Sequence, residues 1–150
     1  MVSMITELPI PKLALRKLKY IGQTVLDREK IADSELSVLL TNDTRITELN
    51  QRYFQRNCAT DVIAFPQSEA ASKPVSAVLG DVVISIDTAE RQAIERNHHL
   101  EDELGYLLIH GILHLLGYDD IKSVSRRKMR AKERVYVTEF HLDAHPETMK

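Results

Sequence analysis

The spacing of apolar positions along the first half of the chain predicts helices interleaved with strands. An apolar stripe with three- and four-residue steps follows the first prolines and predicts a helix, its members being Ala14, Leu18, Ile21 and Val25. Glu35 to Thr41 is predicted to be a strand. Asn42 or Asp43 is expected to cap a following helix, whose apolar face consists of Ile46, Leu49 and Tyr53.

The second half continues the same alternation. Val62 to Phe65 and Val75 to Ile86 supply further strand material, the latter around Gly80. Asp87-Thr-Ala-Glu90 has the sequence of a capping box and predicts the start of another helix. Leu100 to Leu116 is predicted to be a long helix, and a last helix passes through Met129, Tyr136 and Phe140. This alternation indicates a mixed sheet covered by helices.

Length and composition fit one compact domain spanning residues 1–150. The chain has 43% hydrophobic and 28% charged residues, which are ordinary globular values. A single cysteine, Cys58, excludes an internal disulfide framework and suits a reducing compartment. No secretory signal is apparent at the N-terminus, and the longest apolar stretch, Leu104 to Leu116, is too short to cross a membrane. The expected location is the cytoplasm.

The formal net charge of −2 gives no overall attraction to nucleic acid, so RNA binding would depend on local patches. The densest basic cluster comprises Arg126, Arg127, Lys128, Arg130, Lys132 and Arg134. Its alternative interpretation is the solvated outer face of a helix. Ser68 to Ser76, rich in serine, alanine and proline, is expected to be the most flexible loop.

His110-Gly-Ile-Leu-His114-Leu-Leu-Gly117-Tyr-Asp-Asp120 carries three candidate metal ligands. Two histidines four apart lie roughly 40° apart on a helix and about 6 Å along it, so both imidazoles can reach one ion. Gly117 allows a left-handed turn that can bring Asp120 back toward the same ion. This spacing matches the metzincin zinc motif, although Asp119 is an alternative third ligand that lies one residue off.

Two positions differ from the metzincin motif. Gly111 replaces the general-base glutamate, which argues against peptide hydrolysis. Asp120 replaces a third histidine, and carboxylate oxygen is an accepted zinc ligand. Glu103 or Asp81 could serve as hydrogen-bond partners for an imidazole N–H. The alternative interpretation, two core histidines whose ring nitrogens are satisfied by backbone groups or carboxylates, accounts for neither the glycine stop nor the acidic residue.

The remaining histidines are less informative. His98 and His99 are expected to be exposed residues just before the long helix, and His141 and His145 fall in the C-terminal tail.

The string H-G-I-L-H-L-L-G-Y-D-D closely resembles the pattern H-G-x-L-H-L-x-G-Y-D-H of the YbeY family of bacterial and organellar endoribonucleases. Leu49-Asn50 with the segment from Thr60 to Pro66 resembles the family's L-N-x-x-[YFW]…T-D-V-L-S-F-P stretch. Leu79 to Ser85, followed by Thr88-Ala89, resembles its L-G-D-I-x-I-S…T-A stretch. Together the three segments span residues 46 to 120 in family order.

This resemblance implies a zincin-like α+β fold, with a single mixed sheet of about four strands and about five helices. It implies a zinc-dependent, single-strand-specific endoribonuclease acting on the 3′ end of small-subunit ribosomal RNA and in ribosome quality control. One zinc ion per chain would be held by His110, His114 and Asp120. The implied partners are single-stranded RNA, ribosomal RNA and the small ribosomal subunit, with no membrane; the oligomeric state stays open.

The chain departs from the family pattern at three positions. The third ligand is Asp120, the family's arginine implicated in RNA cleavage is Phe54, and the serine of T-D-V-L-S-F-P is Ala64. Arg52 and Arg56 flank Phe54 and are candidate phosphate contacts in place of the missing arginine. Two alternative functions follow: a ribosome- or RNA-binding protein of this fold with weakened cleavage, and a metal-dependent hydrolase of another substrate.

Overall fold

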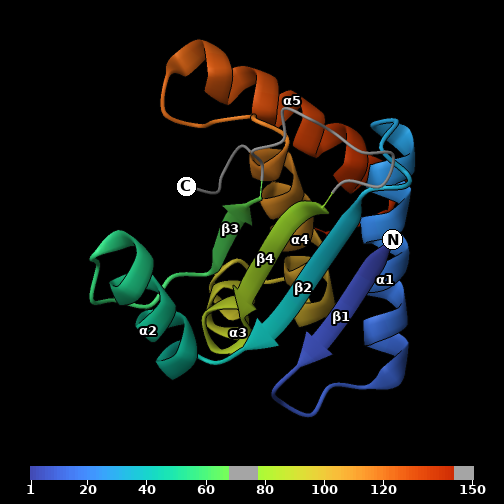
Figure 1. Ribbon diagram of the computed structural model, residues 1–150. Helices are drawn as coiled ribbons and strands as arrows, with labels where there is room; N and C mark the ends of the chain where they lie inside the picture. The colour runs from blue at the N-terminus through green and yellow to red at the C-terminus, as the bar shows by residue number, and fades with distance from the viewer. Residues whose placement is uncertain (68–77, 144–150) are drawn as a thin grey trace.

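The computed structural model describes residues 1–67 and 78–143, which form a four-stranded mixed sheet covered by five helices (Figure 1). The strands are β1 (Val2–Thr6), β2 (Glu35–Thr41), β3 (Val62–Pro66) and β4 (Val78–Ser85). Their order across the sheet is β1-β2-β4-β3, with β1, β2 and β4 parallel and β3 antiparallel to β4. The predicted α+β class with a mixed sheet is therefore confirmed.

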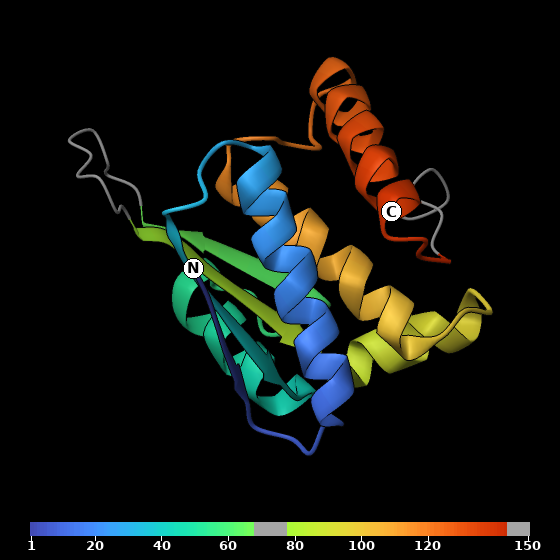
Figure 2. The same cartoon turned by 90° about the vertical axis from the view of Figure 1, so that its right-hand side faces the viewer.

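The helices divide unequally between the two faces of this sheet. They are α1 (Lys12–Arg28), α2 (Asp43–Phe54), α3 (Ile86–Glu95), α4 (Leu100–Leu115) and α5 (Ser123–Glu139). Helices α1, α4 and α5 lie on one side, as Figure 2 shows, whereas α2 packs on the other through Ile46. Helix α4 forms the centre of the core because its apolar residues bury on nearly all sides; Leu104, Leu107, Leu108, Ile109, Ile112 and Leu113 are at most 1% exposed.

The structure differs from the sequence predictions at one strand and at one residue of α2. Strand β1 was not predicted, because the segment is short and an apolar residue on its exposed face breaks the alternation: Val2 is 1% exposed while Ile5 is 59% exposed. Tyr53 was assigned to the buried face of α2 but is 54% exposed, and its ring meets the Phe65 ring edge-on instead.

The helix caps show why one start was predicted and another was misplaced. The Asn42 side chain accepts a hydrogen bond from the Arg45 backbone N–H over 2.8 Å, as expected for the cap of α2. Helix α3, however, is capped by Ser85, whose Oγ accepts from the Thr88 N–H over 3.3 Å. Asp87 lies inside the helix and accepts a hydrogen bond from the Asp43 N–H, so the predicted capping box is wrong.

Some of the sequence predictions concern residues that the structure does not describe. The predicted flexible loop, Ser68 to Ser76, the first residues of the predicted strand from Val75, and His145 all lie outside the described residues. Among residues 1–67 and 78–143, no helix combines the length and apolarity needed to traverse a membrane.

Candidate metal centre and adjoining clefts

The C-terminal half of α4 places His110 and His114 side by side. Because they are four residues apart on one helix, their rings emerge one turn apart on the same face. The two Nε2 atoms are 3.1 Å apart, and both rings are partly exposed to solvent. Helix α4 therefore turns two nitrogen ligands toward one point.

A tight turn after α4 returns the chain to that point. Gly117 has φ +99°, and the Tyr118 N–H donates to the Leu113 carbonyl while the Gly117 N–H donates to the His114 carbonyl. This is the Schellman pattern of a helix end that needs a left-handed residue. It brings an Asp120 Oδ2 to 3.8 Å from His114 Nε2 and 4.0 Å from His110 Nε2.

The three side chains fit a tetrahedral metal ion. One ligand atom from each of His110, His114 and Asp120 lies within 4.8 Å of the others. Tetrahedral zinc with bonds near 2.0 Å needs ligand atoms roughly 3.3 Å apart, so only small side-chain movements are required. Asp119, the alternative third ligand, instead accepts a hydrogen bond from the Ile121 N–H over 2.6 Å.

Glu133 on α5 completes the surroundings of His110, and sequence reasoning missed it. This carboxylate is 0% exposed and accepts a hydrogen bond from His110 Nδ1 over 2.6 Å. Its other oxygen accepts from the Tyr106 hydroxyl and from Arg130, each over 2.9 Å. A carboxylate within the apolar stripe of Met129, Tyr136 and Val137 was the signal available in the sequence.

The charges around this carboxylate favour its ionised form. Burial is the largest influence on Glu133 and opposes ionisation, but hydrogen bonds and charge from His110 and Arg130 hold its pKa below the ordinary value. Burial, followed by the neighbouring His110, lowers the pKa of His114. His114 is thus favoured as a neutral imidazole, the form that binds metals.

The metal-ligand group opens into a hollow of about 420 Å³, which we call the metal cleft. Three cationic side chains line it: Arg56, Arg96 and Arg130. Arg56 follows the end of α2, where Gln55 adopts φ 56° and turns the chain away from the helix axis. Arg52, still on α2, does not line this cleft and lies 6.0 Å from the centroid of the Tyr53 ring.

Glu103, suggested as a hydrogen-bond partner for an imidazole of the metal site, lies away from His110 and His114. Glu103 is buried between Arg96, at 3.1 Å, and His98 Nε2, at 2.5 Å. The His98 side chain is only 2% exposed, so the expectation that it lies on the surface is wrong. The two side chains meet each other across the short turn between α3 and α4.

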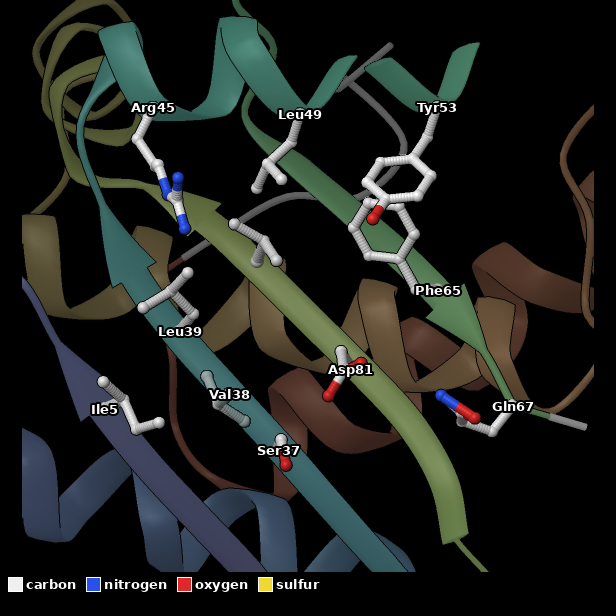
Figure 3. Close-up of a pocket in the computed structure, with 11 residues that line it drawn as sticks. Ile5, Ser37, Val38, Leu39, Arg45, Leu49, Tyr53, Phe65, Gln67 and Asp81 are labelled. Atoms are coloured by element: carbon white, nitrogen blue, oxygen red, sulfur yellow. The ribbon is translucent and has the colours of Figure 1, made fainter. Parts of the chain in front are cut away.

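Asp81 lies on the opposite face of the sheet from the metal cleft. Side chains alternate along a strand, so Val82 faces α4 while Asp81 and Val83 face the side of α2. A second hollow, of about 520 Å³, lies on that side and is lined by Asp81, Ser37, Arg45 and Tyr53 among others. Figure 3 shows how these side chains lie. Asp81 therefore does not approach the histidines.

The basic cluster on α5 divides between two environments. Arg126, Arg127 and Lys128 are exposed, as in the solvated-face interpretation. Lys132 pairs with Glu29 over 3.1 Å, and Arg130 turns into the metal cleft beside Glu133. Only one member of the cluster thus lines the metal cleft.

Comparison with known proteins adds a consistent set of similarities. Residues 6–141 match the model of a family described as Endoribonuclease YbeY. A protein of that name from Heliobacterium modesticaldum is 40% identical over 136 residues, covering 85% of this chain and 78% of its own length. Another from Aquifex aeolicus is 44% identical over 117 residues, covering 78% and 77%. The solution structure of a Thermotoga maritima protein matches with a TM-score of 0.68 and 30% identity, covering 93% of this chain and 89% of that one.

Proposed function

This chain belongs to the endoribonuclease YbeY family, and on that premise we propose that it is a zinc-dependent endoribonuclease specific for single-stranded RNA. Its role is maturation of the 3′ end of small-subunit ribosomal RNA and ribosome quality control in the cytoplasm. It binds one zinc ion per chain, and its residues 1–150 act as one catalytic domain. Single-stranded and ribosomal RNA and the small ribosomal subunit are its partners.

One observation carries this proposal: His110, His114 and Asp120 converge in a cleft that three arginine side chains also line. Two imidazoles and one carboxylate are a donor set that suits zinc and leaves a fourth position for substrate or water. When bound, zinc would act as a Lewis acid on the scissile phosphate. Glu133 would fix the ring of His110 and its tautomer through the 2.6 Å hydrogen bond to Nδ1.

Arg56 is the best-placed candidate for contact with the phosphate. It lines the metal cleft, and its side chain forms no ion pair or hydrogen bond with any residue in the ranges 1–67 and 78–143. A guanidinium without a partner keeps its donors available for phosphate oxygens. Arg130, by contrast, is held by Glu133 and Tyr106 and serves to orient Glu133. Arg52 is the weaker of the two flanking candidates because it lies outside the cleft.

The size of the metal cleft favours an unpaired strand. A hollow of about 420 Å³ has the volume of a typical small-molecule pocket, so it holds only a short segment of an RNA strand. Single strands can be splayed to present one or two nucleotides to such a hollow, whereas the bases of a duplex stay stacked and paired.

The packing of Gly111 argues against peptide hydrolysis. A Cβ atom at this position would lie 2.7 Å from Cγ1 of Val82, too close for any side chain unless Val82 or the backbone around it shifts. The position at which a metzincin carries its general-base glutamate is therefore closed by the packing of α4 on the sheet. A hydrolase of the protease type is disfavoured on steric as well as chemical grounds.

A second candidate function, an RNA-binding protein with weakened cleavage, is motivated by the departures at Ala64, Asp120 and, most directly, Phe54. This ring occupies the position of the arginine implicated in cleavage and cannot neutralise a phosphate. Cleavage and binding therefore have to be measured separately.

The decisive experiment combines metal analysis with cleavage of end-labelled single-stranded RNA, duplex RNA and single-stranded DNA of the same sequence. We expect one zinc per chain, cleavage of the single-stranded RNA only, and its loss in His114→Ala. Arg56→Gln should slow cleavage whereas the matched variant Arg52→Gln should not. Processing of a ribosomal RNA precursor with a 3′ extension tests the assigned substrate. Binding without cleavage in the zinc-loaded protein would instead support the second candidate.

A further inference from the structure

A groove of about 600 Å³ adjoins the metal cleft, and the proposed chemistry does not use it. Its walls include Phe54 at the end of α2 and Ile121 in the connection between α4 and α5. It shares Arg56, Thr60 and His114 with the metal cleft, so the two hollows are continuous. We call it the apolar groove. A substrate strand bound across the metal ligands would therefore continue into this groove.

Phe54 is held with its ring available for stacking. It remains 45% exposed, although it lies against the Phe65 ring with centroids 5.8 Å apart and an interplanar angle of 23°. Phe65 also meets the Tyr53 ring edge-on, with centroids 5.2 Å apart, on the side facing the hollow on the opposite face of the sheet. Because Phe65 backs it from one side, the orientation of the Phe54 ring is set before any ligand arrives, which reduces the entropy lost on binding.

Ile121 contributes further apolar surface to the same groove. It is 80% exposed, the largest exposure of any large hydrophobic residue in the described part of the chain. Scattered exposed apolar residues are normal on protein surfaces. Phe54 and Ile121, however, line the same groove, and this groove is continuous with the metal cleft. They are therefore not scattered exposed residues of this ordinary kind.

We infer that the apolar groove is a nucleobase subsite, in which an unpaired base beside the scissile phosphate stacks on Phe54. The inference rests on the proposed function and adds to it the recognition of one base. Arg56 lines both hollows, so a phosphate bound there places its nucleoside at the groove entrance. A phenyl ring offers a base a π-face without hydrogen-bond selection, and purines stack more strongly than pyrimidines because their rings are larger.

Binding can be measured separately from cleavage with short 2′-O-methyl oligomers whose integrity is checked by electrophoresis. The probes are an oligomer of adenosine and an oligomer with the same number of phosphates in which the residues are abasic. Wild-type protein in its metal-loaded form should bind the adenosine oligomer about 5- to 150-fold more tightly, as expected for one base stacked on an aromatic ring. An oligomer of uridine should fall between the two.

Phe54→Leu keeps apolar bulk but removes the ring, so the ratio of the two affinities should fall to about twofold or less. Tyr53→Leu is the matched control, because Tyr53 also contacts Phe65 but lines the hollow on the opposite face of the sheet. It should leave the ratio unchanged. Thermal unfolding of both variants shows whether either substitution disturbs the fold.

The outcomes separate this inference from the proposed function. If the wild type cleaves single-stranded RNA but binds adenosine and abasic oligomers equally, the nucleobase subsite is overturned and the endoribonuclease assignment stands. The subsite is also overturned if Phe54→Leu retains the ratio, or if Tyr53→Leu lowers it equally. Failure of the wild type to bind or cleave any RNA would overturn both proposals.

Discussion

Glu133 and His110 lie 23 residues apart in the sequence and are joined by a 2.6 Å hydrogen bond between a carboxylate oxygen and Nδ1. The contact links α5 to α4, and it is shielded from water because the Glu133 side chain is buried and that of His110 is only 15% exposed. Because Nδ1 is used in this bond, the other nitrogen of the ring is left to face His114 and Asp120. A residue remote from the predicted metal motif therefore sets the direction of its first ligand.

Replacing Glu133 by glutamine should weaken zinc binding by about 10- to 100-fold, the usual effect of removing the carboxylate behind a ligand histidine. The amide keeps the volume but loses the charge that makes His110 a stronger ligand. The measurement is a competition titration against a chromophoric chelator. Tyr106→Phe is the control, because it removes one hydrogen bond to Glu133 and none to His110. Equal zinc affinities for wild type and Glu133→Gln would show that the contact is only structural.

The third ligand can be tested by a pair of adjacent substitutions. Asp120→Ala should lower the zinc content of the purified protein well below one per chain, because two imidazoles alone hold zinc weakly. Asp119→Ala should retain the zinc, since that carboxylate caps the Ile121 N–H rather than facing the histidines. Asp120→His should also retain it. Loss of zinc in Asp119→Ala with retention in Asp120→Ala would reverse the assignment.

Features governed by near neighbours were predictable from sequence. The cap at Asn42, the stripe that forms α1 and the turn at Gly117 each depend on residues within one or two helical turns. The position of Asp120 near the histidines also depends only on near neighbours. Gly117, in a left-handed conformation after the second histidine, turns the chain so that the residue three positions later lies beside the pair.

Features that depend on packing between distant elements were not predictable. Glu133 becomes a partner of His110 only when α5 lies on α4. The strand pattern shows that Asp81 and Val82 face opposite sides but not which side α4 covers. Arg52 and Arg56 were equivalent in the sequence. The left-handed Gln55 separates them by ending α2 between them.

A second polar cluster makes stability dependent on pH. Asp43 accepts hydrogen bonds from Ser85 and Thr88, each over 2.6 Å, and from Arg91 over 2.9 Å. Burial, the largest influence, raises its pKa, but these three partners together lower it below the ordinary 3.8. A lowered pKa in the folded state stabilises the fold above the ordinary value, and this stabilisation is lost as the pH falls through the folded-state pKa.

Asp43→Asn should therefore reduce the free energy of unfolding by about 1–2 kcal/mol near neutral pH. The difference from wild type should shrink as the pH falls below 3.8 through the lowered pKa of the wild-type carboxyl, which then becomes protonated. Urea titrations at several pH values measure it. Asp33→Asn, at an exposed position, is the control and should change stability little. A difference that stays constant down to this acidic range would contradict the role of the charge.

The last prediction concerns the aromatic residue at the family's arginine position. Phe54 lines the apolar groove next to the metal cleft, so an arginine there could extend toward the phosphate that Arg56 is proposed to bind. A second guanidinium can stabilise charge that develops on the phosphate, whereas a phenyl ring cannot. Measured at saturating RNA, so that loss of the stacking ring does not limit the rate, Phe54→Arg should therefore cleave single-stranded RNA roughly tenfold faster or more. Tyr53→Arg adds the same charge on the other face of the sheet and should have little effect on the rate. Unchanged or slower cleavage in Phe54→Arg would contradict this prediction and favour Arg56 as the cation that already neutralises the phosphate.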